Sequence, residues 1–151
     1  MTNEFDTLLA SRKLTLDFVK DLSSTQLNHI PQGFKNNLIW NMGHLAVTQQ
    51  LLWYSLSEKD MLISSKMVEK YQKGSKPQGI VDIEEIQKIK ELLMTLPVKS
   101  IEDYKNGLFK TYKSYTTSFD VTLNSIEDGV KFNNFHEGLH VGTIMALRKL
   151  V

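Results

Sequence analysis

Apolar side chains recur every three to four residues along four long stretches of this chain. That spacing places them on one face of an α-helix, whereas a half-buried strand would show strict alternation. Because each helix has to bury its apolar face, the helices must pack against one another. The sequence therefore predicts an all-α protein, a four-helix bundle in a single domain over residues 1–151, with helices at about 3–21, 35–56, 82–106 and 125–149.

The expected helix ends carry side chains that stabilise helix termini. Asn3 is placed to cap the first helix, and Asp82 is placed to cap the third, with Glu85 as its capping-box partner. The last helix is expected to start from a cap at Asn124 or Ser125. These capping residues predict where the first, third and last helices begin.

Two connections between the helices are long. In residues 57–81 the glycines and prolines prevent regular structure, apart from short helical turns expected around Leu62 and at 68–71. Residues 109–123 are rich in threonine, serine and aromatic residues, and either a binding lid or a packed surface loop would fit them. Pro97 lies inside the third stretch, where the unbroken apolar phase predicts a kink, or a break and restart, without a change of direction.

Composition limits the classes of function. The formal net charge of +1 argues against a dedicated surface for nucleic acid or anionic membranes. The absence of cysteine excludes disulfides, thiolate metal ligands and a cysteine nucleophile. No apolar run approaches the roughly 20 residues that span a bilayer, and the N-terminus lacks a signal-peptide pattern. We expect a cytoplasmic protein.

The most chemically distinctive motif is H-E-G-L-H, which runs from His136 to His140 on the inward stripe of the last helix. Side chains four apart on a helix lie on one face, so both imidazoles can bind one metal ion. A zinc protease with this motif needs a further ligand downstream. Residues 141–151 contain no histidine, aspartate or glutamate, and Thr143 and Ala146 replace the glycine and histidine of the longer protease pattern. The protease interpretation is therefore rejected.

A third ligand is available upstream, on a polar stripe of the second helix. Asn37, Asn41, His44 and Thr48 are spaced by four, three and four residues, and Trp40 flanks them. Such a stripe can be the solvent-exposed edge of an amphipathic helix, or it can face a partly buried cavity. The aromatic neighbour favours the cavity.

Three histidines would make a site for a divalent metal with one position left open, which is characteristic of catalytic zinc. The ligands would be His44, His136 and His140. Zinc or nickel is expected first, with iron, manganese and copper as further candidates. The alternative is that the histidines are core residues with ordinary hydrogen-bond partners. His29, in a loop beside a proline, is expected to be solvated.

Two glycines lie next to the expected ligands. Gly43 precedes His44, and Gly138 lies between the two histidines of the last helix. A glycine inside a helix costs about 1 kcal/mol relative to alanine, so a packing reason is expected. We expect both glycines to let the two ligand-bearing helices approach closely.

Two segments resemble one known family. Residues 38–45, L-I-W-N-M-G-H-L, look like the W-N-x-G-H-L segment of DinB-like proteins. Residues 135–142, F-H-E-G-L-H-V-G, followed by Leu147 and Arg148, look like the terminal H-E-x-x-H-x-G-x-x-x-x-L-[KR] helix of that family. Helix lengths and order extend the resemblance over most of the chain.

The resemblance implies an up-down-down-up bundle with a long crossover between the second and third helices, which would be residues 57–81. It implies that His44, His136 and His140 bind a divalent metal. Several DinB-like proteins are metal-dependent transferases of low-molecular-weight thiols such as bacillithiol or mycothiol, including a maleylpyruvate isomerase branch. Members are often homodimers, so a homodimer is expected here.

The expected function is thus a metal-dependent thiol S-transferase that acts on two small molecules, a thiol and an electrophile. Asn41 and Glu137 are the candidate catalytic residues, and Asn37, Trp40 and Thr48 are candidates for binding substrate. Two alternatives remain open. One is a hydrolase that uses water activated by the metal, and the other is a non-catalytic metal-binding bundle.

Overall fold

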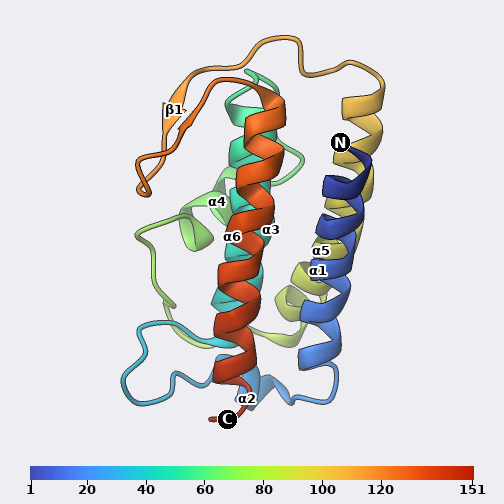
Figure 1. Ribbon diagram of the computed structural model, residues 1–151. Coiled ribbons are helices and arrows are strands. Elements are labelled where there is room, and N and C mark those ends of the chain that lie inside the picture. Colours follow the sequence, from blue (N-terminus) through green and yellow to red (C-terminus); the bar gives the residue numbers. More distant parts are fainter.

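Four long helices pack side by side in the computed structural model, which describes all residues, 1–151 (Figure 1). They are α1 (Thr2–Val19), α3 (Leu38–Gln50), α5 (Ile83–Lys105) and α6 (Ile126–Leu147). A π-helical turn, η1 (Leu51–Ser55), extends α3 directly. The connections carry the short helices α2 (Ser24–Asn28) and α4 (Ser65–Tyr71) and an antiparallel pair of two-residue strands, β1 (Tyr115–Thr116) and β2 (Thr122–Leu123). The predicted all-α class is confirmed.

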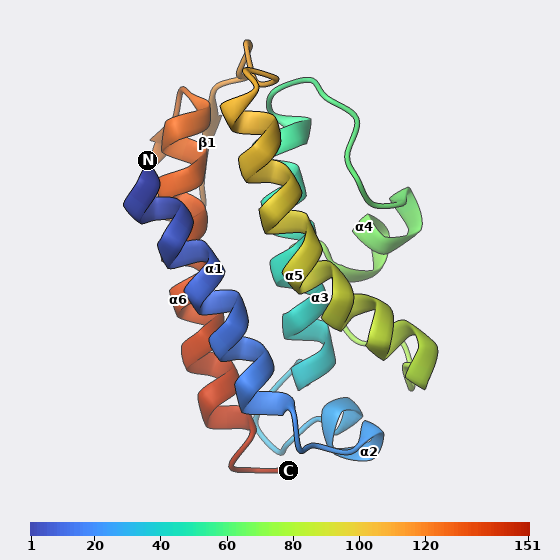
Figure 2. The ribbon, with the colours of Figure 1, turned by 90° about the vertical axis from the view of Figure 1, so that its right-hand side faces the viewer.

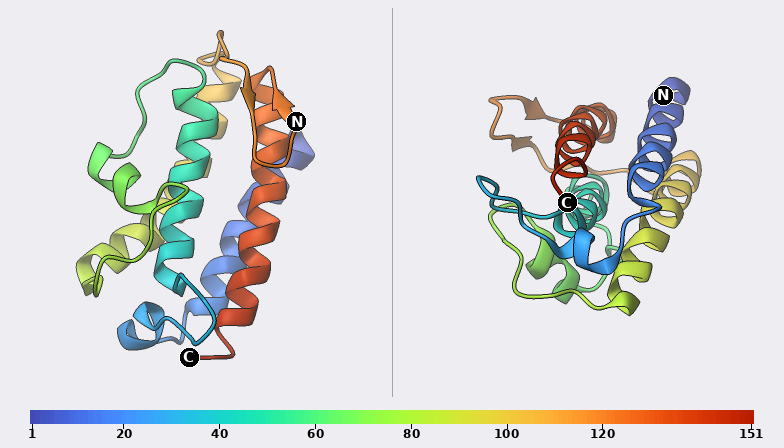
Figure 3. Two further views of the ribbon diagram at one scale, coloured as in Figure 1. Left: turned by 90° about the vertical axis from the view of Figure 1, so that its left-hand side faces the viewer. Right: turned by 90° about the horizontal axis from the view of Figure 1, so that it is seen from below.

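The helices follow the expected up-down-down-up order. α1 and α6 run in one direction, and α3 and α5 run in the other (Figure 2). α1 contacts α5 and α6, and α3 contacts the same two helices. Seen from below, α1 and α5 lie to one side of α3 and α6 (Figure 3). Because α3 and α5 are parallel, the chain must return along the bundle between them, and residues 57–81 make this crossover. No helix has the length and hydrophobicity that a membrane span requires.

Two of the predicted helix caps, Asp82 and Ser125, are confirmed. Glu85 is wrong as the capping-box partner of Asp82, because its carboxylate is bound to Lys70 and Tyr71 instead. The Asp82 carboxylate accepts a hydrogen bond from the backbone N–H of Glu85 at 2.8 Å, and the Ser125 hydroxyl accepts one from the first turn of α6 at 3.1 Å. Asn3 is wrong as a cap, because α1 already begins at Thr2 with Met1 as its N-cap residue. No side chain caps α1, so this helix end is held by packing and by its backbone bonds.

The second long helix is shorter than predicted and changes its hydrogen-bond pattern. Asn37 is the N-cap of α3, because its side-chain oxygen accepts a hydrogen bond from the backbone N–H of Trp40 at 2.9 Å. The helix therefore begins at Leu38. At its other end the backbone N–H of Leu56 reaches the carbonyl of Leu51 at 3.1 Å, an i→i+5 bond that widens the helix. α5, in contrast, continues through Pro97 as one helix. Of the two predicted alternatives, a kink or a break and restart, the structure excludes the break.

α3 is the central helix, because every residue in it except Thr48 is buried. α5 and α6 pack against it, and the short helices α2 and α4 cover its remaining faces. Its polar side chains therefore cannot form a solvent-exposed edge. The alternative in which the polar stripe faces solvent is excluded, and each polar group on α3 needs a partner inside the protein.

Candidate metal centre

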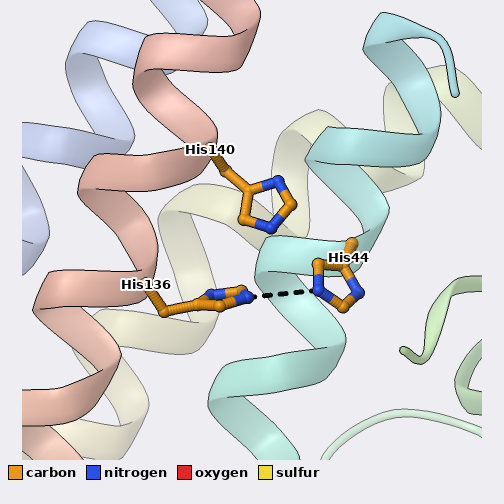
Figure 4. Close-up of side chains that lie close together, drawn as sticks. All are labelled: His44, His136 and His140. Carbon is orange, nitrogen blue, oxygen red and sulfur yellow. Dashed lines mark hydrogen bonds between the residues drawn. The ribbon is translucent and has the colours of Figure 1, made fainter. Parts of the chain in front are cut away.

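The three expected ligands come together between two neighbouring helices. α3 carries His44, and α6 carries His136 and His140 on successive turns. One nitrogen atom from each ring lies within 4.8 Å of the others, and the ring centroids are 4.5 to 5.0 Å apart. Figure 4 shows the rings turned toward a common point between the helices. The group could hold a metal ion.

The proton on His44 can be assigned from its partner. Nδ1 of His44 lies 2.7 Å from the backbone carbonyl oxygen of Tyr71, at the end of α4. A carbonyl oxygen only accepts, so Nδ1 must carry the hydrogen. In the neutral ring, Nε2 is then a free lone pair, and it points to the common centre (Figure 4). A partner of this kind on the far nitrogen is the usual way to orient a metal-binding histidine.

The proton on His140 follows from a chain of two hydrogen bonds. The side-chain amide of Asn41 donates from Nδ2 to the backbone carbonyl of Asn37 at 2.7 Å, which fixes the orientation of that amide. Its Oδ1 therefore faces Nδ1 of His140, at 2.8 Å. Nδ1 of His140 must donate, and Nε2 keeps its lone pair. Asn41 thus orients a ligand from behind, without lining the cavity described below.

His136 completes the group. Its Nε2 lies 3.2 Å from Nε2 of His44 (Figure 4), and its Nδ1 is buried without a partner. Because the facing nitrogen of His44 is a lone pair, Nε2 of His136 must carry a hydrogen when no cation is present. With a cation at the centre, the hydrogen of His136 would shift to its Nδ1, and the lone pairs of all three Nε2 atoms would face the cation. The donor set therefore fits a divalent metal that accepts imidazole, such as zinc.

Burial keeps the three rings neutral. It lowers the pKa of His44. It also lowers the pKa of His136 to about 2 and that of His140 to about 4, and for these two the neighbouring histidines add to the effect. Neutral imidazole is the form that binds metal. At neutral pH no imidazolium ring therefore has to lose a proton before a cation binds.

These lowered pKa values predict a pH-dependent stability for the metal-free protein. The unfolded chain binds more protons than the folded one below pH 6.5, so stability present at neutral pH is lost as the pH falls from about 6.5 toward 4. The expected loss is up to about 1.4 kcal/mol per pH unit for each histidine. Urea unfolding between pH 7 and 5 measures it. His140→Gln should flatten the dependence, and replacement of the exposed His29 should not. Equal slopes for all three proteins would contradict the assignment.

A partly open cavity of about 510 Å³ lies beside the histidines. Its walls come from α3 and η1 on one side and from α6 and the β1–β2 hairpin on the other, with the loop after α4 at the rim. Cavities of this size hold small molecules. Among the 18 residues that line it there is no aspartate or glutamate. The cavity gives the metal position access from solvent.

The five predicted catalytic and substrate-binding residues have different places. Trp40 and Thr48 line the cavity: the Trp40 ring stacks on His44 with centroids 4.7 Å apart, and the Thr48 hydroxyl lies 3.3 Å from Nε2 of His44. Asn41 lies behind His140. Asn37 does not reach the cavity, because its oxygen caps α3 and its Nδ2 donates to the carbonyl of Asn28 at 2.9 Å.

The carboxylate of Glu137 lies away from the histidines, in contact with α1. It receives two hydrogen bonds from the Arg12 guanidinium, at 2.7 and 2.8 Å, and further ones from Ser11 and Asn133 at 3.3 and 3.4 Å. Arg12 and Glu137 are 0% and 1% exposed. The reason is helical geometry, since residues adjacent in sequence point about 100° apart. The structure thus gives Glu137 a role in the core and no contact with a metal ligand.

The close approach at Gly43 involves a different partner from the one predicted. A Cβ added at Gly43 would lie 2.6 Å from the ring of Tyr71, whereas one at Gly138 would meet nothing within 4 Å. Gly43 therefore admits α4, and Gly138 faces open space. The Glu85 carboxylate holds Tyr71 in place, because it accepts a hydrogen bond from the Tyr71 hydroxyl. The same carboxylate forms an ion pair with Lys70 at 2.6 Å. The predicted helix-to-helix role of both glycines is wrong.

Gly43→Ala should weaken metal binding, because the added methyl displaces the Tyr71 ring and with it the carbonyl that orients His44. Loss of such a partner typically costs 10–100-fold in metal affinity, so about tenfold is expected. Overpacking should also cost about 1–3 kcal/mol of stability. Gly138→Ala is the matched control, since it adds the same methyl group to open space on the other ligand-bearing helix. Calorimetric zinc titration of both variants measures the difference, and equal affinities would refute the role of Tyr71.

Two structural features of the cavity wall, the π-helical turn and the hairpin, were not predicted from the sequence. The π-helical turn puts Leu51, Leu52 and Ser55 in the cavity wall, and no local residue pattern distinguishes it from an α-helix. The β1–β2 hairpin lies within residues 109–123, for which the sequence predicts only a binding lid or a packed surface loop. The position of Arg12 did carry a signal. It falls at regular helical spacing on the buried face of α1, where an arginine needs a buried partner.

Together the fold and the site define an all-helical bundle protein whose three-histidine group can hold a metal ion. The sequence model of the DinB superfamily matches residues 7–144, so the chain belongs to the DinB superfamily. In structure it is similar to a conserved protein from Enterococcus faecalis, with a TM-score of 0.63 and 19% identity over 99% of this chain and 95% of that one. That likeness shows the fold alone. No curated protein matches the sequence.

Proposed function

We propose that this protein is a metal-dependent S-transferase that joins a small thiol to a small electrophile. The observation that carries the proposal is the convergence of three neutral imidazoles at one end of a partly open cavity. Two of them, His44 and His140, present lone pairs fixed by partners on their far nitrogens. Zinc or nickel suits this donor set best, and iron, manganese or copper could replace them.

When bound, a divalent cation lowers the pKa of a thiol so that thiolate exists at neutral pH. The chain holds the reactants in place. The Thr48 hydroxyl lies beside the histidines and can hydrogen-bond the sulfur, and the Trp40 ring forms the adjacent wall. The sulfur then forms a bond to the electrophilic carbon, the bond to the leaving group breaks with its electron pair, and the thiol proton passes to water.

The lining of the cavity favours transfer over hydrolysis. A hydrolase commonly uses a carboxylate or a free histidine as general base beside the attacking water. None of the lining residues is a carboxylate, and the three histidines that line it are the expected ligands. Glu137, the sequence candidate, is paired with Arg12 in the core. A thiol needs less help, because coordination to a metal is enough to deprotonate it.

The direct test loads the purified protein with zinc or nickel and follows conjugation of monochlorobimane to cysteine, glutathione and bacillithiol. We expect at least one thiol to be conjugated at a rate that needs the metal and is lost in His44→Ala. Metal-dependent cleavage of nitrophenyl esters without conjugation would favour the hydrolase. Metal binding without either reaction would favour a non-catalytic bundle.

We also propose that the chain forms a homodimer, as DinB-like proteins often do. Sedimentation velocity at micromolar concentration measures its mass directly. A species near twice 17.3 kDa is expected, and a monomer at all concentrations would contradict the proposal.

A further inference from the structure

We propose that the thiol substrate has an apolar body and one carboxylate, and that the carboxylate pairs with Lys73 at the rim of the cavity. This inference rests on the proposed function, because it assumes that the thiol sulfur occupies the metal end. The inference concerns the part of the thiol substrate that extends from the sulfur toward the rim. The three supporting observations are the apolar walls, the distribution of charge along the lining and the fixed position of the backbone at Lys73.

Apolar groups supply most of the exposed wall between the metal end and the rim, and the polar lining there comes from Asn36, Ser55, Tyr115, Thr117 and Ser118. Trp40, Leu51 and Leu52 come from α3 and η1, and Phe119, Phe132 and Leu139 come from the hairpin and α6. Figure 1 shows the hairpin standing beside the upper part of α6. A ligand that fills the space between these walls exchanges water for aliphatic and aromatic carbon.

The charge along the lining is of one sign. Besides the three histidines, Lys73 is the only ionisable side chain apart from tyrosine among the lining residues. Lys73 forms no ion pair in the structure, whereas its neighbour Lys70 is paired with Glu85. A bound divalent cation would add further positive charge at the other end. The cavity therefore favours an anionic ligand, with one negative charge at the metal and a second one at the rim.

The backbone that carries Lys73 is held in place. Residues 72–75 form a turn closed by the Ser75 N–H, which donates to the carbonyl of Gln72 at 3.1 Å. Gly74 takes the positive φ of 88° that such a turn needs in its third residue. The Ser75 hydroxyl accepts a hydrogen bond from the Trp40 indole N–H at 3.0 Å and donates one to the backbone carbonyl of Lys70 at 2.9 Å. The turn is thus tied to the cavity wall, and Lys73 reaches the rim from a fixed base.

A matched pair of thiols tests the inference. The probes are 4-(mercaptomethyl)benzoate and its neutral amide, titrated calorimetrically into the zinc-loaded full-length protein. The carboxylate should bind about three- to fivefold more tightly than the amide, which is the usual strength of one partly exposed ion pair. Lys73→Gln should bring the ratio to one, and added salt should reduce it. Lys76→Gln, which changes an exposed lysine outside the lining, should leave the ratio unchanged.

The outcomes separate this inference from the proposed function. If both thiols bind equally well, or if Lys73→Gln leaves the preference intact, the anionic subsite is wrong while metal-dependent thiol binding stands. Mercaptoacetate, which lacks the apolar body, should bind at least about tenfold more weakly than the aromatic carboxylate, and equal binding would refute the apolar part. If no thiol binds to the zinc-loaded protein, the proposed function itself fails.

Discussion

Glu137→Gln is expected to lower the free energy of unfolding by about 3–5 kcal/mol. The substitution keeps the shape of the side chain but leaves the Arg12 guanidinium charged, buried and without its counter-ion. Arg12 would keep only neutral acceptors: the amide oxygen of the new side chain, the carbonyl of Leu45 at 2.9 Å and the Gln49 side chain at 3.5 Å. Since domains are typically stable by about 5–15 kcal/mol, this loss would bring the protein near its unfolding threshold.

Urea denaturation of the metal-free variants measures the effect. The double variant Arg12→Met/Glu137→Leu should recover much of the stability, because it removes both charges and keeps apolar volume in the core. The recovery separates the cost of an unpaired charge from the cost of altered packing. A double variant as unstable as Glu137→Gln would show that packing, and not the charge, dominates.

The same variant decides the role of Glu137. Because the carboxylate contacts none of the three histidines, the folded fraction of Glu137→Gln should bind zinc with nearly wild-type affinity below its melting temperature. A variant of wild-type stability that loses turnover would contradict this assignment. It would return Glu137 to the catalytic role that its place in the H-E-x-x-H motif first indicated.

His44→Ala is expected to weaken metal binding by more than about 100-fold, because a change one step behind a ligand already costs 10–100-fold. Removing His44 leaves two imidazoles from one helix and takes away the link between α3 and α6. The metal-free variant should stay folded, because the ring is replaced at the edge of a cavity and its partner, the carbonyl of Tyr71, can be hydrated from there. Zinc titration by calorimetry and thermal melting of the metal-free proteins give the two quantities.

A matched control is His29→Ala, which removes an exposed histidine from a loop. It should change neither the zinc affinity nor the melting temperature. Collapse of the His44→Ala fold in the absence of metal would indicate that the histidine cluster is mainly structural. Undiminished zinc affinity would place the metal elsewhere on the chain.

Local sequence patterns were sufficient for the main features of the fold. Apolar periodicity gave the long helices, and the caps at Asp82 and Ser125 gave two of their starts, because a side chain that binds the first turn acts over a few residues. Helical spacing also placed His136 and His140 on one face. The prediction of a three-histidine site also required His44, which lies some ninety residues before the other two histidines. The polar stripe of the second helix indicated His44, and the family resemblance supported that choice.

Features that depend on distant partners were not predictable in this way. Asn41 was expected as a catalytic residue, yet its amide is fixed by one backbone carbonyl and orients His140. Gly43 was expected to face α6, but Tyr71 of the crossover lies against it. The place of Glu137 depends on Arg12, more than one hundred residues earlier. Each of these contacts is set by how the helices pack, which a single sequence does not record.

X-ray absorption at the zinc edge tests the central claim most directly, on tag-free protein loaded with one equivalent of zinc. Nitrogen scatterers of three imidazoles at about 2.0–2.1 Å are expected, and a thiol substrate should add one sulfur at about 2.3 Å. His136→Ala should remove one imidazole from the spectrum. A shell of oxygen atoms with fewer than two imidazoles, or a spectrum unchanged by that substitution, would contradict a metal centre built from His44, His136 and His140.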